Sequence, residues 1–220
     1  MQLGASGESV HVINADLLDA LARERALTQC HTLLGGVDLL INCAGQSSFC
    51  PFPEEHPALI ENIIQLNLLT PMLLTRQLLP EMIERGSGRI VNVGSTFGSI
   101  GFAWFAAYSA SKFGLRGFSE ALRRELDGTG VGVTYVAPRA VKTGFNADSV
   151  YRMAEATGMN MDDPNWTAAK IVSAIERDTK EIHFGFPERL FARINNSLPR
   201  LIDNGLRKQN RIMERFARGE

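Results

Sequence analysis

The sequence predicts an α/β fold in which a parallel sheet is covered by helices on both faces. Short apolar segments alternate along the chain with longer segments of helical periodicity. The short segments are continuously apolar, as in Leu39-Leu40-Ile41, and this is typical of strands that are buried on both sides. The chain has 220 residues, of which 45% are hydrophobic, so it can form one domain with a substantial core.

Strands are expected near residues 10–14, 37–42, 88–94, 131–137 and 180–184. Helices are expected near residues 17–33, 56–84, 107–127, 149–157, 165–177 and 187–217. Several helices are followed by glycine, which accepts the left-handed conformation that ends a helix. The helix near 56–84 is apolar nearly all round, so we expect it to be buried on most of its sides.

The composition limits the partners, the location and the metal sites that can be expected. The formal net charge is −1, which gives no indication of a nucleic-acid partner. The three cysteines, Cys30, Cys43 and Cys50, have no CxxC spacing, so a reducing, cytoplasmic location is expected. The four histidines are scattered without metal-ligand spacing, and no metal site is expected.

Tyr108 and Lys112 are the most informative pair, because residues four apart lie on the same face of a helix. A phenol titrates near pH 10, which makes it a poor acid or base at neutral pH, and a nearby cation lowers its pKa. Ser95 follows a predicted strand and could reach the same cleft. We therefore predict that Lys112 lowers the pKa of Tyr108 and that Tyr108 acts as a general acid or base.

At these residues the chain resembles the short-chain dehydrogenase/reductase family, and the resemblance runs from about residue 8 to about residue 185. It also includes Asn42-Cys43-Ala44-Gly45, Asn67, Asp16 and the segment 138–143. The resemblance implies a Rossmann-like doubly wound parallel sheet. It also implies hydride transfer between NAD or NADP and an alcohol or carbonyl substrate.

The resemblance implies catalytic roles for Ser95, Tyr108, Lys112 and Asn67. Tyr108 would exchange the proton, Ser95 would hydrogen-bond the substrate oxygen, and Lys112 would also hold the nicotinamide ribose. Asn67 would support a water-mediated proton relay to the lysine. Asn67 could instead satisfy a carbonyl group that Pro71 leaves free in the same helix.

The resemblance also implies a cofactor site. Asn42, Ala44 and Gly45 would let the chain pass close to the adenosine, while Val141 and Thr143 would hold the nicotinamide amide, beside Tyr108 and Lys112. Asp16 would either contact the adenine or cap the following helix. Arg139 stands where the family usually has glycine, so it could narrow the pocket or pair with an acidic group or a phosphate.

The family's glycine-rich phosphate-binding turn, which follows a first strand and begins a helix, is not found in the sequence. Gly4-Ala5-Ser6-Gly7 precedes the first predicted strand and is interpreted as a loop. We therefore expect an N-terminally truncated fold, without the first two strands, in which residues 39–41 form an exposed apolar edge. Two explanations stay open. The chain could be a fragment or have an upstream start, or residues 10–14 could pair with residues 39–42.

Residues 1–186 are expected to form the catalytic domain and residues 187–220 a helical extension. The extension carries eight Lys or Arg and four Asp or Glu, a net charge of +4, with apolar residues at helical spacing. Such a basic amphipathic helix could pack on the body of the protein or a second subunit, or it could lie on an anionic membrane.

Two functions are compatible with the sequence. The first is an NAD(P)-dependent oxidoreductase whose substrate lid, near residues 145–163, favours an apolar alcohol or carbonyl compound. The second is a non-catalytic scaffold that keeps the catalytic residues but cannot bind a dinucleotide. The resemblance also implies a homo-oligomer, since the helix near 56–84 and the helix that carries Tyr108 commonly form the subunit interface in the family.

Overall fold

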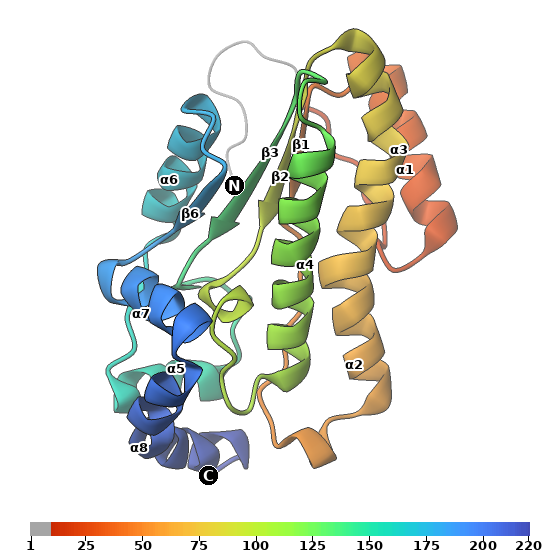
Figure 1. Ribbon diagram of the computed structural model, residues 1–220. Helices are drawn as coiled ribbons and strands as arrows, with labels where there is room; N and C mark the ends of the chain where they lie inside the picture. The colour runs from red at the N-terminus through yellow and green to blue at the C-terminus, as the bar shows by residue number, and fades with distance from the viewer. Residues whose placement is uncertain (1–9) are drawn as a thin grey trace.

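The computed structural model describes residues 10–220, and its centre is a parallel sheet of four strands (Figure 1). The strand order is β1-β2-β3-β6. Ile41 pairs with Val91 between the first two strands, and Val91 pairs with Thr134 between the next two. The bounds are Leu39–Asn42 (β1), Gly88–Val93 (β2), Val131–Ala137 (β3) and Glu181–His183 (β6). The predicted α/β class is confirmed.

The helices connect the strands in the predicted alternation. Their bounds are Ala20–Leu34 (α1), Pro57–Ile64 (α2), Thr70–Arg85 (α3), Ala106–Glu125 (α4), Asp148–Thr157 (α5), Pro164–Glu176 (α6), Phe186–Ser197 (α7) and Pro199–Ala217 (α8). Shorter helical segments cover Phe52–Glu54 (η1), Gln65–Leu69 (η2) and Thr96–Gly98 (η3).

The sheet is covered on both faces because neighbouring residues in a strand point to opposite sides. On one face, Ile90 packs with Leu78 and Met82 of α3 and with Leu122 of α4. On the other face, Val91 and Val136 pack with Ala174 of α6. Figure 1 shows α6 across the sheet from α3 and α4.

The predicted strand near 10–14 is wrong. Residues 10–16 run outside any sheet, and Val10 and Val12 are 50% and 83% exposed. Helix α1 begins at Ala20, three residues later than predicted, because Asp19 accepts a hydrogen bond from the Leu21 N–H and caps the helix. The Gly4–Gly7 segment lies outside the described residues.

Strand β1 is an edge strand of the described sheet and pairs with β2 alone. Leu39 and Ile41 are 39% and 44% exposed, as the sequence predicted for this edge. The alternative in which residues 10–14 pair with β1 is not observed.

The predicted helix near 56–84 is one continuous helical stretch, but residues 65–69 form a wider π-helical turn ahead of Pro71. Proline lacks the N–H that an α-helical ladder needs, so the hydrogen-bond pattern changes here. The expectation that most sides are buried is wrong, because Leu69, Met72 and Ile83 are exposed. By length and composition alone, Pro57–Arg85 could cross a membrane, a test that core helices of other folds also pass.

Two features of the fold were not predicted from the sequence. Strands Ala140–Val141 (β4) and Met161–Asp162 (β5) form a small parallel pair at the base of the segment that joins β3 to α6. The helix predicted over 187–217 is two helices, broken at Leu198, which has φ −138° and ψ 61°. The residue before a proline avoids the helical conformation, and Pro199 follows.

The two C-terminal helices pack on the body of the protein. Met213 of α8 is fully buried in a cluster with Phe105, Tyr108 and Met153. The Trp104 indole N–H donates to the Asn210 carbonyl at 3.2 Å, and the Asn195 amide donates to the Ser99 carbonyl at 2.9 Å. Packing on the body, one of the two alternatives for the extension, is therefore observed.

Candidate active site

A cavity of about 430 Å³ opens at the carboxyl ends of β2 and β3. Ligands of open α/β sheets bind at this edge of the sheet. Six of the predicted site residues line the cavity, namely Gly45, Ser95, Tyr108, Lys112, Val141 and Thr143. Asp16, Asn42, Ala44 and Asn67 do not line it.

Ser95 lies two residues beyond β2, at the start of η3. Its backbone is extended, and its Oγ accepts a hydrogen bond from the Phe97 N–H at 3.1 Å. The Ser95 side chain also lies close enough to Tyr108 to lower the pKa of the phenol. The loop after the strand therefore brings the serine to the tyrosine, as the sequence predicted.

Tyr108 lies in the first turn of α4 and is buried among aromatic side chains. Its ring is 6.0 Å from that of Phe97 and 6.1 Å from that of Phe145, between centroids. Burial raises the pKa of Tyr108 to about 12, and the nearby Ser95 side chain offsets only part of this increase. At neutral pH the side chain is therefore a neutral phenol, which can donate a proton.

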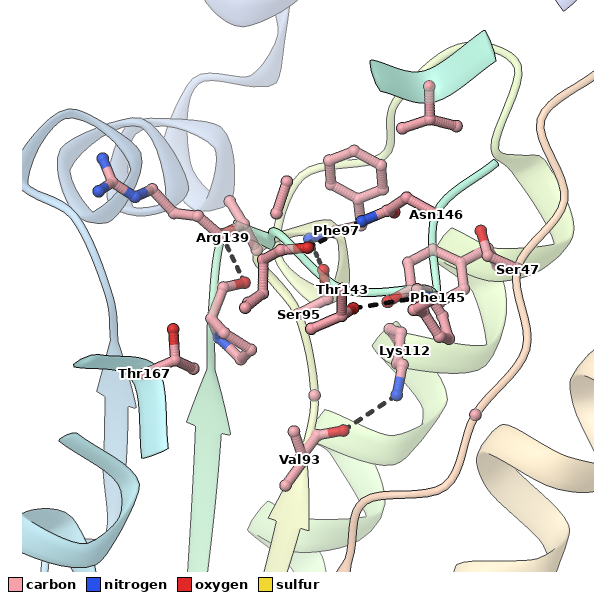
Figure 2. A pocket seen from close by; sticks show the side chains of 18 of the residues that line it. Ser47, Val93, Ser95, Phe97, Lys112, Arg139, Thr143, Phe145, Asn146 and Thr167 are labelled. Carbon is pink, nitrogen blue, oxygen red and sulfur yellow. Dashed lines mark hydrogen bonds between the residues drawn. The ribbon is translucent and has the colours of Figure 1, made fainter. Parts of the chain in front are cut away.

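Lys112 lies one turn further along α4, and its Nζ donates to the Val93 carbonyl at 2.9 Å (Figure 2). The same nitrogen is 5.7 Å from the centroid of the Tyr108 ring. Burial lowers the pKa of Lys112 to about 8, so the ammonium loses its proton at a lower pH than an exposed lysine does. The Tyr108 pKa is therefore raised by burial, and the decrease that was expected from Lys112 is not found.

Asn67 is fully buried in the π-helical turn, and both the oxygen and the nitrogen of its side-chain amide are hydrogen-bonded. Oδ1 accepts from the Gln46 N–H at 2.8 Å, and Nδ2 donates to the Gln46 carbonyl at 2.8 Å and to Ser111 Oγ at 3.0 Å. The amide thus fixes the chain after β1 rather than a carbonyl of its own helix. The relay role of Asn67 stays a prediction.

Asn42 ends β1 and points into the protein. Its amide donates to Asn92 at 2.8 Å, and Asn92 in turn donates to Ser119 of α4 at 2.8 Å. The turn that follows, Cys43 to Gly45, is where the chain passes the cavity. A Cβ on Gly45 would lie 3.2 Å from Asn67 Oδ1 and 3.8 Å from Lys112 Nζ, so the glycine permits this close approach.

Val141 and Thr143 line the cavity from the segment after β3. The Val141 carbonyl accepts from the Asn146 amide at 3.0 Å, and the Thr143 carbonyl accepts from the Tyr151 hydroxyl at 2.8 Å. These bonds order the first residues of the predicted lid, which continues through α5.

The guanidinium of Arg139 is paired with acidic groups, which is one of the alternatives that the sequence left open for this residue. Nε donates to Asp162 Oδ2 at 3.1 Å, another nitrogen donates to Asp162 Oδ1, and Nη1 lies 3.5 Å from Glu188 Oε1. Figure 2 shows the guanidinium pointing away from Lys112. Arg139 therefore connects β5 and α7 to the wall of the cavity.

Asp16 is exposed and lies outside the cavity. Its carboxylate accepts from the Leu18 N–H at 2.9 Å, two residues away. The alternative in which Asp16 caps the following helix is wrong, since Asp19 occupies that position. The adenine contact stays a prediction.

Sequence reasoning missed Tyr135 and Met213. Tyr135 of β3 is 1% exposed, and its hydroxyl lies 3.4 Å from the Ser95 backbone nitrogen. The available signal was the pair of glycines around Ser95, Gly94 and Gly98, which leave room for a large side chain. Met213 reaches the Tyr108 cluster from α8, more than 100 residues later in the chain, and no local pattern indicates this.

Comparisons with known proteins match most of the chain. The family profile described as short chain dehydrogenase matches residues 1–153. A ketoacyl reductase of Nostoc sp. is 38% identical over 179 residues, which cover 81% of this chain and 62% of that relative. The chain spans about half of the length of other curated relatives that it matches.

Two solved structures have the same fold. A short-chain dehydrogenase from Streptomyces avermitilis superposes with a TM-score of 0.73 at 28% identity, over 89% of this chain and 78% of that one. A 4-hydroxyisoleucine dehydrogenase complexed with NADH and succinate gives a TM-score of 0.67 at 24% identity, over 77% of this chain and 74% of that one.

Proposed function

This chain belongs to the short-chain dehydrogenase family, and we propose that it acts as an NAD(P)-dependent oxidoreductase of alcohols or carbonyl compounds. The observation that carries the proposal is the convergence of Ser95, Tyr108 and Lys112 on one cavity. A bound nicotinamide would supply or accept the hydride, and the side chains of the protein would bind and orient the substrate.

The residues around the cavity fit the nicotinamide half of such a cofactor. Gly45 leaves the space next to Lys112 free of a side chain, and Val141 and Thr143 line the same space. These residues, with Tyr108 and Lys112, would hold the ribose and the amide. Asn42 and Ala44 would shape the turn beside the adenosine, and Asp16 would lie at the adenine.

We propose that Tyr108 is the proton donor when a carbonyl compound is reduced. A phenol with a pKa of about 12 keeps its proton at neutral pH and can pass it to a substrate oxygen as hydride reaches the adjacent carbon. Ser95 Oγ would hydrogen-bond the same oxygen and stabilise its developing charge. The Lys112 ammonium would then stabilise the phenolate that remains, with Asn67 supporting the relay that returns the proton.

The substrate is proposed to be apolar near its reacting carbon. Aromatic and aliphatic side chains make up most of the wall beside Tyr108, and Arg139 is already paired with Asp162 and Glu188. A substrate carboxylate would therefore find no free arginine there. The apolar residues that line this part of the cavity are Phe97, Phe105, Val150, Met153, Met159 and Ile171.

A homo-oligomer is proposed on the outer face of α3 and α4. Leu69, Met72, Ile83 and Phe113 are 36% to 41% exposed, which is unusual for large apolar side chains of one region. A groove between the two helices is lined by Leu79, Pro80 and Phe118 among others. Light scattering after size-exclusion chromatography should give a mass of at least two chains, and a mass of 24.2 kDa would contradict this.

Peripheral contact with an anionic membrane is proposed for α7 and the start of α8. Exposed apolar side chains on these helices alternate with Arg189, Arg193 and Arg200, a pattern that suits lipid headgroups above an apolar layer. The exposed apolar residues are Phe186, Leu190, Phe191, Leu198 and Leu201. More of the protein should sediment with phosphatidylserine vesicles than with neutral vesicles, and Phe191→Ser should reduce the fraction that sediments.

A cytoplasmic location is supported by the three free thiols, and it would place this surface at the inner leaflet of the membrane.

The alternative is a scaffold that does not bind a dinucleotide. It is favoured by one observation, namely that residues 10–220 contain no TGxxxGxG turn between a strand and a helix. Fluorescence titration of the folded 220-residue chain with NADH and NADPH separates the two functions. Saturable micromolar binding supports the oxidoreductase, and its absence in a folded sample supports the scaffold for this chain.

A further inference from the structure

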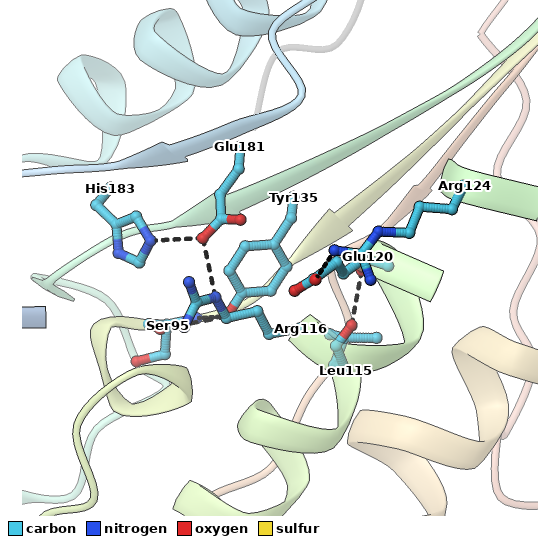
Figure 3. A network of polar contacts seen from close by, with 9 residues as sticks. Ser95, Leu115, Arg116, Glu120, Arg124, Tyr135, Glu181 and His183 are labelled. Atoms are coloured by element: carbon cyan, nitrogen blue, oxygen red, sulfur yellow. Dashed lines mark hydrogen bonds and ion pairs between the residues drawn. The ribbon is translucent and has the colours of Figure 1, made fainter. Parts of the chain in front are cut away.

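A second buried tyrosine lies directly against the backbone of the site serine. Tyr135, in the middle of β3, is 1% exposed. Its hydroxyl donates to the Ser95 carbonyl at 3.4 Å and accepts from the Ser95 N–H at 3.4 Å (Figure 3). One phenol therefore contacts both polar groups of the Ser95 backbone.

The space around Ser95 is shaped for this ring. A Cβ on Gly94 would lie 2.1 Å from the Tyr135 hydroxyl oxygen, and a Cβ on Gly98 would lie 2.4 Å from it. The Gly98 position would also be 2.7 Å from the Lys112 carbonyl oxygen. No larger residue fits at either place, so the two glycines let the ring, the Ser95 loop and α4 meet.

The other side of the Tyr135 ring faces an ion-pair network. Glu181 is opposite Tyr135 in the strand register, and Glu181 Oε1 accepts from Arg116 Nε at 2.9 Å and contacts His183 Nε2 at 2.8 Å. The His183 and Tyr135 ring centroids are 6.5 Å apart. Figure 3 shows this network beside the Tyr135 ring, with Ser95 at the hydroxyl end. The ring is therefore held between β6 and the loop that carries the serine.

Burial raises the pKa of Tyr135 above its ordinary value. The hydroxyl thus stays neutral, and it can donate one hydrogen bond and accept another at the same time. A deprotonated phenol could not donate to the Ser95 carbonyl. The contact to both groups of the backbone is consequently stable across the pH range in which an enzyme works.

We propose that Tyr135 is a positioning residue, which fixes the Ser95 backbone and so holds the Ser95 hydroxyl against Tyr108. The inference rests on the proposed oxidoreductase function for its effect on turnover, but the positioning itself does not require turnover. Tyr135 contacts neither the cavity nor a reacting atom, so it would act entirely through Ser95.

The test uses NMR of the full chain with ¹³Cζ-labelled tyrosine. The chain has three tyrosines, so three resonances are expected, and phenylalanine variants assign them. Tyr135→Phe should shift the Tyr108 resonance in the same direction as Ser95→Ala does. The double variant should add little to either change, because both substitutions disturb the same contact between Ser95 and Tyr108. Tyr151→Phe is the matched control, since it removes a phenol that contacts the Thr143 carbonyl and not Ser95.

A Tyr108 resonance that is unchanged in folded Tyr135→Phe, or a double variant with fully additive changes, would overturn the proposal. If Tyr135→Phe does not fold, hydrogen exchange in the unaltered chain decides the question. The Ser95 N–H, which donates to Tyr135, should be protected, and rapid exchange of this proton would contradict the inference.

Turnover supplies an independent measurement. With any carbonyl substrate that the unaltered chain reduces, Tyr135→Phe should lower kcat by about tenfold with little change in KM, because a small displacement of Ser95 affects the transition state most. If the unaltered chain reduces no substrate and binds no dinucleotide, the proposed function fails. The NMR result would then still show whether Tyr135 positions Ser95.

Discussion

The side chain of Asn67 and the backbone of Gln46 exchange two hydrogen bonds, each of 2.8 Å. This exchange joins the π-helical turn of the α2–α3 stretch to the chain that leaves β1. The same amide also donates to Ser111, one residue before Lys112. The position of the Gly45 turn is therefore coupled to the helix that carries Tyr108 and Lys112.

Asn67→Ala should destabilise the protein and weaken dinucleotide binding together. The variant leaves both backbone groups of Gln46 without partners in a part-buried place, which costs about 1–3 kcal/mol for each unsatisfied group. Urea denaturation measures the loss of unfolding free energy, and NADH titration measures binding. Asn67→Asp should also destabilise the protein, because its carboxylate can accept from the Gln46 N–H but cannot donate to the Gln46 carbonyl. Wild-type stability in both variants would show that this pair of hydrogen bonds is unimportant.

Lys112 should make the stability depend on pH. Its pKa falls from 10.5 to about 8 on burial, so between these values the unfolded chain binds a proton that the folded chain does not. The free energy of unfolding therefore rises with pH in this window, by up to about 1.4 kcal/mol per unit, and the gain is lost as pH falls through 8. Above pH 10 the raised pKa of Tyr108 acts in the opposite direction.

Denaturation at several pH values between 8 and 10 measures this slope. Lys112→Met should flatten it, whereas Lys170→Met should leave it unchanged, because Lys170 is exposed beside Trp166. Equal slopes in the wild type and Lys112→Met would mean that the folded chain keeps Lys112 protonated.

Tyr108→Phe should nearly abolish carbonyl reduction while NADH still binds. Loss of a general acid lowers rates by about 10²- to 10⁴-fold, and the buried ring that packs on Phe97 and Phe145 is retained. Steady-state kinetics and fluorescence titration separate these effects. Arg124→Ala, which removes an exposed side chain that does not line the cavity, should retain most of the activity. Undiminished turnover in Tyr108→Phe would assign the proton transfer to another group.

Arg139→Gly, which restores the residue usual in the family, should destabilise this protein. The side chain of Asp162 is 8% exposed and would lose its partner, and breaking a buried ion pair from one side costs about 3–5 kcal/mol. Urea denaturation is again the measurement. Arg124→Ala is the control, because the Arg124–Glu120 pair is 73% and 39% exposed and should contribute no more than about 1 kcal/mol. Similar losses in both variants would contradict a special role for Arg139.

The sequence by itself determined the alternation of strands and helices, because continuous apolar strands and helix-period segments are local patterns. It also determined the Ser95, Tyr108 and Lys112 constellation, since the spacing of Tyr108 and Lys112 fixes their common face on one helix. The exposure of Leu39 and Ile41 was also predicted, because the predicted strand order has no strand on the outer side of residues 39–41.

The tertiary structure decided what depends on contacts between distant segments. Residues 10–14 have the apolar composition of a strand, but a strand needs a hydrogen-bonded neighbour, and none lies beside them in the described residues. The ionisation of Tyr108 depends on how completely Phe97, Phe105 and Met213 exclude water, and α8 supplies the last of these. Likewise, the contact of Tyr135 with Ser95 joins residues 40 positions apart, a distance that no local pattern can specify.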